Sequence, residues 1–111
     1  MTITKDGRIV LNADAGELLR RAGGKFVHIL WDAAAYKIAL RPLAKTNRSA
    51  FKLTTKRGRR SMVISGATFL RYIRWDLSKT VTVPVEWNEK ERVLEASLMA
   101  VGRFTRSQSE K

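Results

Sequence analysis

The 111-residue sequence contains no cysteine, only two prolines and a single histidine. Without cysteine there is no disulfide framework and no thiolate metal site, which is consistent with a reducing compartment. No apolar run approaches the ~18 residues of a membrane span, and the first six residues lack the apolar segment of a signal peptide. We therefore expect a soluble cytoplasmic protein that makes no use of a membrane.

Carboxylates are also scarce, because ten Asp and Glu face twenty-two Lys and Arg, for a formal net charge of +12. So large a positive field favours a polyanion as partner, most commonly nucleic acid. An anionic membrane is a lesser option, and a basic surface kept only for solubility is the plain alternative.

The residues for catalysis are few. His28 lies between Phe26 and Leu30 in a β-rich run, which is typical of a core or interface histidine rather than a general base or ligand. No nucleophile-elbow motif and no phosphate loop are present. The clustered carboxylates of the last hairpin alternate with cations, so a solvated hairpin end is favoured over a metal site; they are Glu86, Glu89, Glu91 and Glu95. We predict no enzymatic activity, no metal and no cofactor.

The first half of the chain predicts a hairpin, a helix and a second hairpin. Residues 3–12 alternate around an Asp-Gly turn, a strong hairpin signal. Asp14 and Glu17 have the spacing of a capping box, and Gly23-Gly24 would end the helix. Two strands follow, residues 25–32 and 36–40, the second ended by Pro42.

The second half predicts the same order of elements. Strands are expected at 51–55 and 61–64 around a basic turn, with Ser65 as the N-cap of a helix. A strand over 79–87 would tolerate Pro84 only at an edge or bulge, and a return strand over 92–98 completes the pattern.

Two constant offsets relate the halves. An offset of 51 aligns Leu18 with Phe69 and Leu19 with Leu70 in the helices, and an offset of 56 aligns the last hairpins. Chance agreement between short amphipathic elements is the alternative to duplication. The resulting hypothesis is a β-rich α+β fold of two β-hairpin–helix–β-hairpin repeats packed as one compact pseudo-twofold domain. Its parts are a first repeat over 1–43, a connection over 44–50, a second repeat over 51–99 and a polar basic tail over 100–111.

The first half also resembles the AbrB/MazE-type swapped-hairpin DNA-binding domain. The matching motifs are Gly7-Arg8-Ile9, Arg20-Arg21, Val27-x-Ile29, Asp32 and Ile38-x-Leu40-x-Pro42. With its second half as a degenerate copy, the chain is similar to two-repeat, MraZ-like members. The resemblance implies that Lys5, Arg8, Arg20 and Arg21 contact DNA, with Lys56, Arg57, Arg59 and Arg60 as their second-copy equivalents.

Charge geometry adds further cations to this candidate surface. The span 45–60 holds seven cations and no carboxylate, and basic residues also follow the second predicted helix. For Arg20 and Arg21, favourable interaction with the helix dipole is an equal alternative to ligand contact. The complete set of predicted nucleic-acid-binding residues is Lys5, Arg8, Arg20, Arg21, Arg48, Lys52, Lys56, Arg57, Arg59, Arg60, Arg71 and Arg74.

These features predict a DNA-binding transcriptional regulator, nucleoid-associated, whose two basic turns emerge on one side of the fold and straddle a duplex. An RNA- or ribosome-associated protein using the same patch, and an antitoxin-like protein-interaction module, stay open as alternatives. The tryptophans could stack on single-stranded bases, but core positions are favoured for Trp31 and Trp75. The resemblance implies a homodimer, whereas an internal repeat could complete the fold within one chain.

Overall fold

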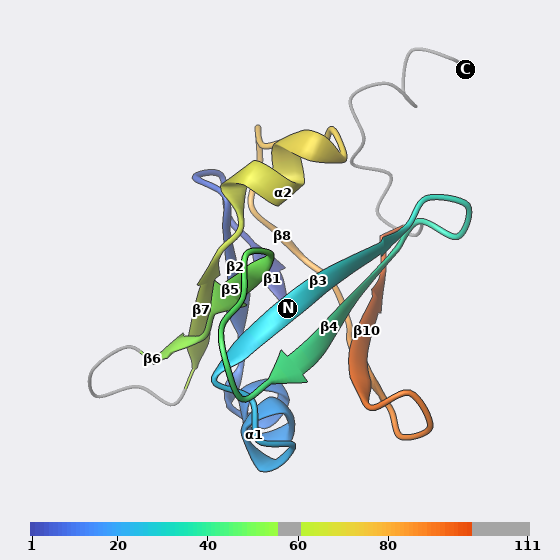
Figure 1. Ribbon diagram of the computed structural model, residues 1–111. Helices are drawn as coiled ribbons and strands as arrows, with labels where there is room; N and C mark the ends of the chain where they lie inside the picture. Colours follow the sequence, from blue (N-terminus) through green and yellow to red (C-terminus); the bar gives the residue numbers. More distant parts are fainter. Residues whose placement is uncertain (56–60, 99–111) are drawn as a thin grey trace.

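Ten strands and two helices form the described part of the chain, residues 1–55 and 61–98 of a computed structural model (Figure 1). The helices are α1 (Ala13–Arg21) and α2 (Ala67–Tyr72). Sheet A is antiparallel, in the order β6 (Thr54–Thr55), β7 (Met62–Ser65), β2 (Arg8–Leu11), β1 (Thr2–Ile3) and β8 (Val81–Thr82). Sheet B is also antiparallel, in the order β5 (Ala50–Lys52), β3 (Phe26–Asp32), β4 (Lys37–Leu43), β10 (Val93–Ser97) and β9 (Glu86–Asn88). The prediction of a strand-rich α+β fold is confirmed.

The two sheets continue into each other at both edges. Only Leu53 separates β5, at an edge of sheet B, from β6, at an edge of sheet A. Residues 83–85 likewise connect β8 at the other edge of sheet A to β9 in sheet B. Strands that pass from one sheet to the next form corners, so the sheets enclose a common core in the manner of a barrel. The single strand predicted over 79–87 was wrong: the chain leaves the sheet at 83–85, and Pro84, which cannot donate a ladder hydrogen bond, lies in that break.

One continuous apolar cluster fills the space between the sheets. Alternate strand residues point inward, as period-2 patterning predicts. The fully buried residues include Ile9 and Ile64 from sheet A, with Ile38 and Leu94 from sheet B. Leu19 of α1 and Leu70 of α2 complete the cluster, and the helices lie at opposite ends of the molecule (Figure 1).

The tryptophans belong to this core. Trp75 is buried, and Trp31 and Trp87 are half-buried and pack against the cluster. The Trp31 ring is edge-on to Phe69, with ring centroids 6.4 Å apart. The prediction of core tryptophans is confirmed.

Both predicted helix N-caps were wrong. Asn12, which directly follows β2, caps α1: its side-chain oxygen accepts from the Ala15 N–H at 2.9 Å, and Asp14 lies inside the first turn. Ser65 is the last residue of β7, and Gly66 occupies the cap of α2 with no side-chain hydrogen bond. In each case the end of the strand decides where the helix begins: β2 ends at Leu11, directly before the cap, and β7 extends to Ser65.

The predicted end of the second strand in the first half was also wrong. β4 continues through Pro42 to Leu43, with Pro42 opposite Val27 of β3. Because β10 pairs with β4 only over Lys37–Leu40, Pro42 lies beyond the part of β4 that has strands on both sides. Proline is tolerated there, as it is on edge strands.

The ends of the two helices match in detail. In α1 the N–H groups of Ala22, Gly23 and Gly24 donate to the carbonyls of Leu18, Arg20 and Leu19. In α2 the N–H groups of Ile73, Arg74 and Trp75 donate to the carbonyls of Phe69, Arg71 and Leu70. Each pattern is a Schellman motif with a left-handed residue, φ 85° at Gly23 and φ 63° at Arg74. Every equivalent pair is separated by 51 residues.

The β3–β4 and β9–β10 hairpins match in the same way. Asp32 and Asn88 each accept, through the side-chain oxygen, the N–H of the residue three positions on. Four positions on, Tyr36 and Arg92 have φ values of 52° and 56°. These equivalent residues are separated by 56 positions.

Candidate nucleic-acid interface

The pairing of β2 with β7 decides which basic segments lie together. Arg8 is opposite Ser65, whereas Leu11 is opposite Met62. The turn over 4–7 precedes Arg8 and α2 follows Ser65, so both lie at one end of the molecule, here called the α2 end. α1 follows Leu11 at the other end, the α1 end, where β7 also begins.

Both basic turns were expected to emerge on one side, and the second of them, residues 56–60, lies outside the described residues. Thr55 and Met62, which flank residues 56–60, are paired with each other, and Met62 is also paired with Leu11 at the α1 end. The turn over 4–7 lies at the α2 end, where the Gly66 N–H donates to the Gly7 carbonyl at 3.0 Å. The described residues on either side of 56–60 therefore lie at the α1 end, whereas the turn over 4–7 lies at the α2 end.

The predicted residues are divided between these ends. The α2 end carries Lys5, Arg8, Arg71 and Arg74, and the α1 end carries Arg20, Arg21 and Lys52, all of them exposed. Arg48 is exposed in the loop between β4 and β5. Lys56, Arg57, Arg59 and Arg60 lie outside the described residues.

At the α2 end, part of the positive charge is neutralised. Arg8 Nε lies 3.3 Å from Asp6 Oδ2, with both side chains more than half exposed. The Thr4 hydroxyl, which donates to Asp6, and the Arg8 guanidinium both lower the pKa of the Asp6 carboxyl. Asp6 therefore stays ionised and competes with a phosphate for Arg8. Tyr72, beside Arg71, is 77% exposed.

At the α1 end, one carboxylate serves two arginines. Glu17 accepts hydrogen bonds from Arg20 and, at 3.1 Å, from Arg21 Nε. These bonds, first that from Arg20 and then that from Arg21, lower the pKa of Glu17. The arginine side chains are still 66% and 76% exposed. Pairing along the helix thus orients both guanidinium groups and leaves one of the two positive charges uncompensated.

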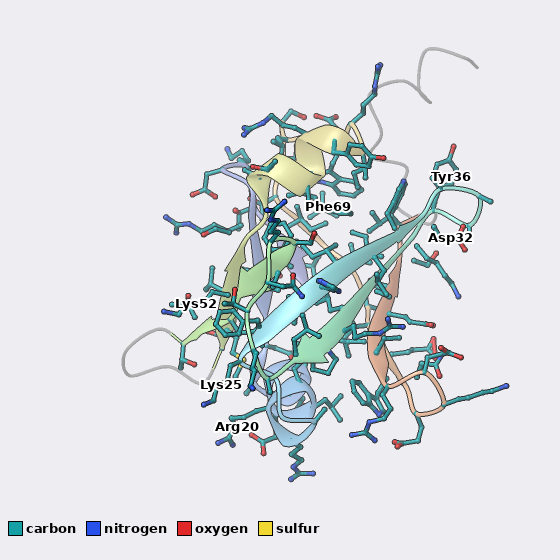
Figure 2. All side chains as sticks on the ribbon, viewed as in Figure 1. Arg20, Lys25, Asp32, Tyr36, Lys52 and Phe69 are labelled. Atoms are coloured by element: carbon teal, nitrogen blue, oxygen red, sulfur yellow. The ribbon has the colours of Figure 1, made fainter. Side chains whose placement is uncertain are left out.

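A hollow of about 420 Å³ lies beside α1. Among the described residues that line it, the charged side chains are the cations Arg20, Lys25 and Lys52, with no carboxylate. Figure 2 shows these three residues on the same side of the molecule, far from Asp32 and Tyr36 at the other end of β3. Within residues 1–55 and 61–98, no carboxylate lies within ion-pair distance of Lys25 or Lys52. The hollow is thus a concave surface of one charge sign.

Sequence reasoning missed Lys25. It lies between the end of α1 and β3, where its N–H donates to the Leu43 carbonyl at 2.9 Å and its carbonyl accepts from the Leu53 N–H at 3.1 Å. Lys25 lies near a second cation only because β5 pairs with β3 and brings Lys52 opposite Phe26. The sole sequence signal was a cation directly after the helix-ending glycines.

The outer face of sheet B extends this basic surface. His28 is opposite Arg41 on β4 and Ala50 on β5, and its Nε2 lies 3.1 Å from Asn47 Oδ1. His28 therefore faces outward, and of the two expected roles the core position is wrong. Arg41 and Arg48 are both exposed nearby in the fold.

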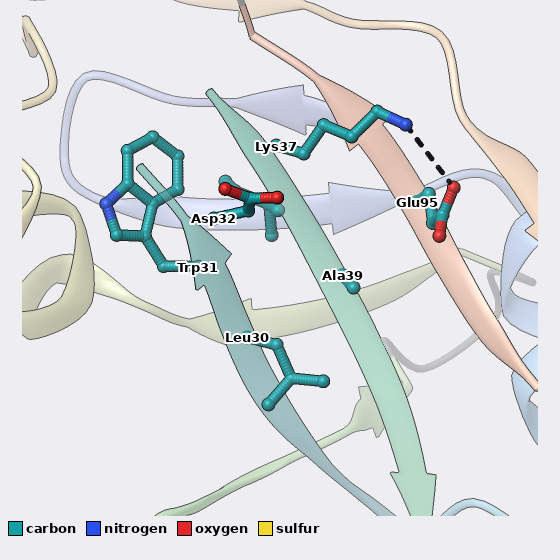
Figure 3. A pocket seen from close by; sticks show the side chains of 7 residues that line it. Leu30, Trp31, Asp32, Lys37, Ala39 and Glu95 are labelled. Atoms are coloured by element: carbon teal, nitrogen blue, oxygen red, sulfur yellow. Dashed lines mark ion pairs between the residues drawn. The ribbon is translucent and has the colours of Figure 1, made fainter. Parts of the chain in front are cut away.

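The opposite end of sheet B has mixed charge. A hollow of about 160 Å³ is lined there by Leu30, Asp32, Lys37, Glu95 and neighbouring residues (Figure 3). Lys37 Nζ lies 3.8 Å from Glu95 Oε1, the ion pair drawn in Figure 3. With Asp32 beside it, this hollow would repel a phosphate. The molecule therefore has a basic and a mixed-charge side.

Among the described residues, no cluster of histidine and acidic side chains could hold a metal ion. In the same part of the chain, neither helix is long and apolar enough to cross a membrane. Comparison of the chain with protein-family models, curated proteins and solved structures finds no match.

Proposed function

We propose that the protein is a non-catalytic, double-stranded-DNA-binding protein of the transcriptional-regulator type, and that its main contact surface is the α1 end. The observation that carries this proposal is the hollow lined by Arg20, Lys25 and Lys52 without a carboxylate. Lys52 lies in β5, and the backbone of Lys25 is hydrogen-bonded to Leu43 and Leu53, so the backbone of both lysines is held in place before a ligand arrives. Concave surfaces of one charge sign concentrate the opposite charge and speed its association.

The chain is, in this proposal, an internal repeat with pseudo-twofold symmetry. The Schellman motifs at an offset of 51 and the hairpin turns at an offset of 56 support it. The strand order supports it too, because β7–β2 and β4–β10 are central antiparallel pairs in the two sheets. The same features favour the resemblance to a two-repeat swapped-hairpin domain.

One duplex can reach both ends across the outer face of sheet A. A row of uncharged side chains crosses that face, each paired with the next: Thr54, Val63, Val10, Thr2 and Thr82. The four residues of β2 span about 10 Å at ~3.4 Å per residue. Most cations of the two ends lie beyond β2, in turns, helices and loops, so they would contact phosphates that are farther apart than this along one duplex.

The test is to measure duplex binding by the full chain, with fluorescence anisotropy as the readout, at several salt concentrations. If about 4–6 phosphates are contacted, log K falls against log salt with a slope of roughly −4 to −5. A competing structured RNA of equal length should displace the duplex poorly. A slope near zero would overturn the proposal, and tighter binding of the RNA would replace duplex DNA with RNA as the partner.

A further inference from the structure

The hollow at the α1 end combines two kinds of surface. Its apolar floor includes Phe26, Leu53 and Met62, and its rim carries the cations Arg20, Lys25 and Lys52. Phosphate binding alone needs only cations, so the exposed aromatic floor requires a separate explanation. The floor is concave and partly open to solvent, since Phe26 and Leu53 are only half-buried.

Strand pairing fixes the relative positions of floor and rim. Phe26 of β3 is directly opposite Lys52 of β5, so their side chains lie on the same face of sheet B. Directly paired residues have Cβ atoms about 4.5–5.5 Å apart. Lys25, next along the chain, is held by backbone hydrogen bonds to Leu43 and Leu53. Both lysines therefore line the same hollow as Phe26, on a backbone that hydrogen bonds hold in place.

A planar base bearing phosphates has the matching chemistry. A base stacked on an aromatic side chain gains about 1–3 kcal/mol, whatever the base. Lysine and arginine bind the attached phosphates by charge-assisted hydrogen bonds. A hollow of about 420 Å³ also falls in the range of roughly 300–1,000 Å³ that is usual for small-molecule sites. The mixed-charge hollow of Figure 3 fails this comparison, because Asp32 and Glu95 would repel phosphate.

We infer that this hollow binds a nucleoside phosphate, with the base on Phe26 and the phosphates on Lys25 and Lys52. The ligand is either a free nucleotide or one unstacked nucleotide of a single strand, since both present the same chemistry. The inference of nucleotide binding depends only on the hollow. If the proposed function also holds, a nucleotide and a duplex should compete for the protein, because Arg20 and Lys52 cannot bind both at once.

The experiment is calorimetric titration of the full chain with adenosine triphosphate, inorganic tripolyphosphate and adenosine, without divalent cations. Adenosine triphosphate should bind about tenfold more tightly than tripolyphosphate, because only the nucleotide carries a base to stack. Phe26→Ala should remove that difference and leave the tripolyphosphate affinity unchanged, whereas Lys52→Ala should weaken both. Equal affinity of the two triphosphates for the unmodified chain would overturn the inference.

Matched controls separate stacking from folding. Phe26→Leu keeps an apolar side chain for packing but removes the aromatic ring, so it should lose the preference for the nucleotide while melting like the unmodified protein. Tyr72→Ala removes an exposed ring at the other end and should change nothing. If Phe26→Leu folds and retains the full preference, the base does not lie on Phe26 and the inference fails.

Two further arms distinguish the source of the ligand and isolate the proposed function. A single-stranded thymidine octamer and thymidine triphosphate are compared for their sensitivity to Phe26→Leu. A larger loss for the octamer identifies a nucleotide within a strand, and a larger loss for the triphosphate identifies a free nucleotide. Duplex binding is measured separately: a chain that binds adenosine triphosphate but no duplex retains this site and loses the regulator function.

Discussion

The α1 end and the α2 end are built alike but carry different charge. At the α2 end, Gly7 in a hairpin turn lies against Ala67 of α2; at the α1 end, Gly16 of α1 lies against Met62 at the start of β7. In both places a glycine lets a helix approach a hairpin. The charges differ, because the α1 end has a cation-lined hollow while Arg8 at the α2 end is paired with Asp6. The two ends therefore share a local packing arrangement but not a distribution of surface charge.

The largest difference between the ends should be seen in stability. A Cβ at Gly7 would lie 2.5 Å from Ala67 Cβ and 2.8 Å from its Cα, at a φ of 87°. Left-handed backbone costs about 1–2 kcal/mol for a side-chain-bearing residue, and overpacking adds about 1–3 kcal/mol. Gly7→Ala should therefore lower the free energy of unfolding by about 3 kcal/mol, measured by urea denaturation with tryptophan fluorescence.

Gly16→Ala is the matched substitution at the α1 end. Its Cβ would lie 3.2 Å from Cγ of Met62, a flexible side chain. Alanine also favours the helix over glycine by about 1 kcal/mol. The two effects should nearly cancel, leaving a change within about 1 kcal/mol. Equal losses for the two variants would show that the ends do not differ in packing as the structure has them.

The second difference concerns affinity for duplex DNA. Lys25→Ala with Lys52→Ala removes two cations from the hollow and should weaken duplex binding about tenfold at low salt, with a salt slope smaller by about 2. Lys5→Ala with Arg71→Ala removes the same charge from the α2 end and should weaken binding less, about threefold. Both are measured by fluorescence anisotropy against the same duplex.

Because the two double variants have the same net charge, a general electrostatic effect predicts equal losses. Equal losses would therefore remove the α1 end as the main contact surface. Lys37→Ala, next to Glu95 on the mixed-charge side, serves as a control and should have little effect on affinity.

The sequence predicted those parts of the fold that depend on neighbouring residues. Alternation identified the inward residues Ile38 and Leu40, and Gly23-Gly24 ended α1 as predicted. The pairing of β2 with β7 could not be predicted, because alternation shows which face a residue is on but not which distant strand lies beside it. That one register placed the turn over 4–7 and the residues that flank 56–60 at opposite ends.

The candidate site was predictable to the same extent. Arg20 was implied by the family resemblance and Lys52 was selected by charge, and both line the hollow. Lys25 comes to lie beside Lys52 only because β3 pairs with β5. The same pairing places Phe26 in the lining of the hollow. Asn12 rather than Asp14 caps α1 because β2 ends at Leu11, although both side chains can accept the same hydrogen bond.

The smallest expected effect concerns Glu17, the carboxylate of α1 that pairs with Arg20 and Arg21. Glu17→Gln removes the negative charge and one of the two acceptor oxygens that bind Arg20 and Arg21, and the two consequences have opposite signs. Duplex affinity should rise roughly twofold, because both guanidinium groups can then turn to phosphates and the local charge is more positive. Stability should fall slightly, since an exposed pair contributes little.

The pH dependence separates this loss of stability from other causes. The pKa of Glu17 is lowered in the folded protein from its ordinary value of 4.5, so its pairing stabilises the fold above that pH. The contribution disappears as the pH falls through the lowered pKa and Glu17 becomes protonated. The difference in melting temperature between Glu17→Gln and the unmodified chain should thus be present at pH 7 and shrink as the pH falls below 4.5 and Glu17 becomes protonated. A difference that does not shrink with falling pH would attribute the loss to packing rather than to the ion pairs at the α1 end.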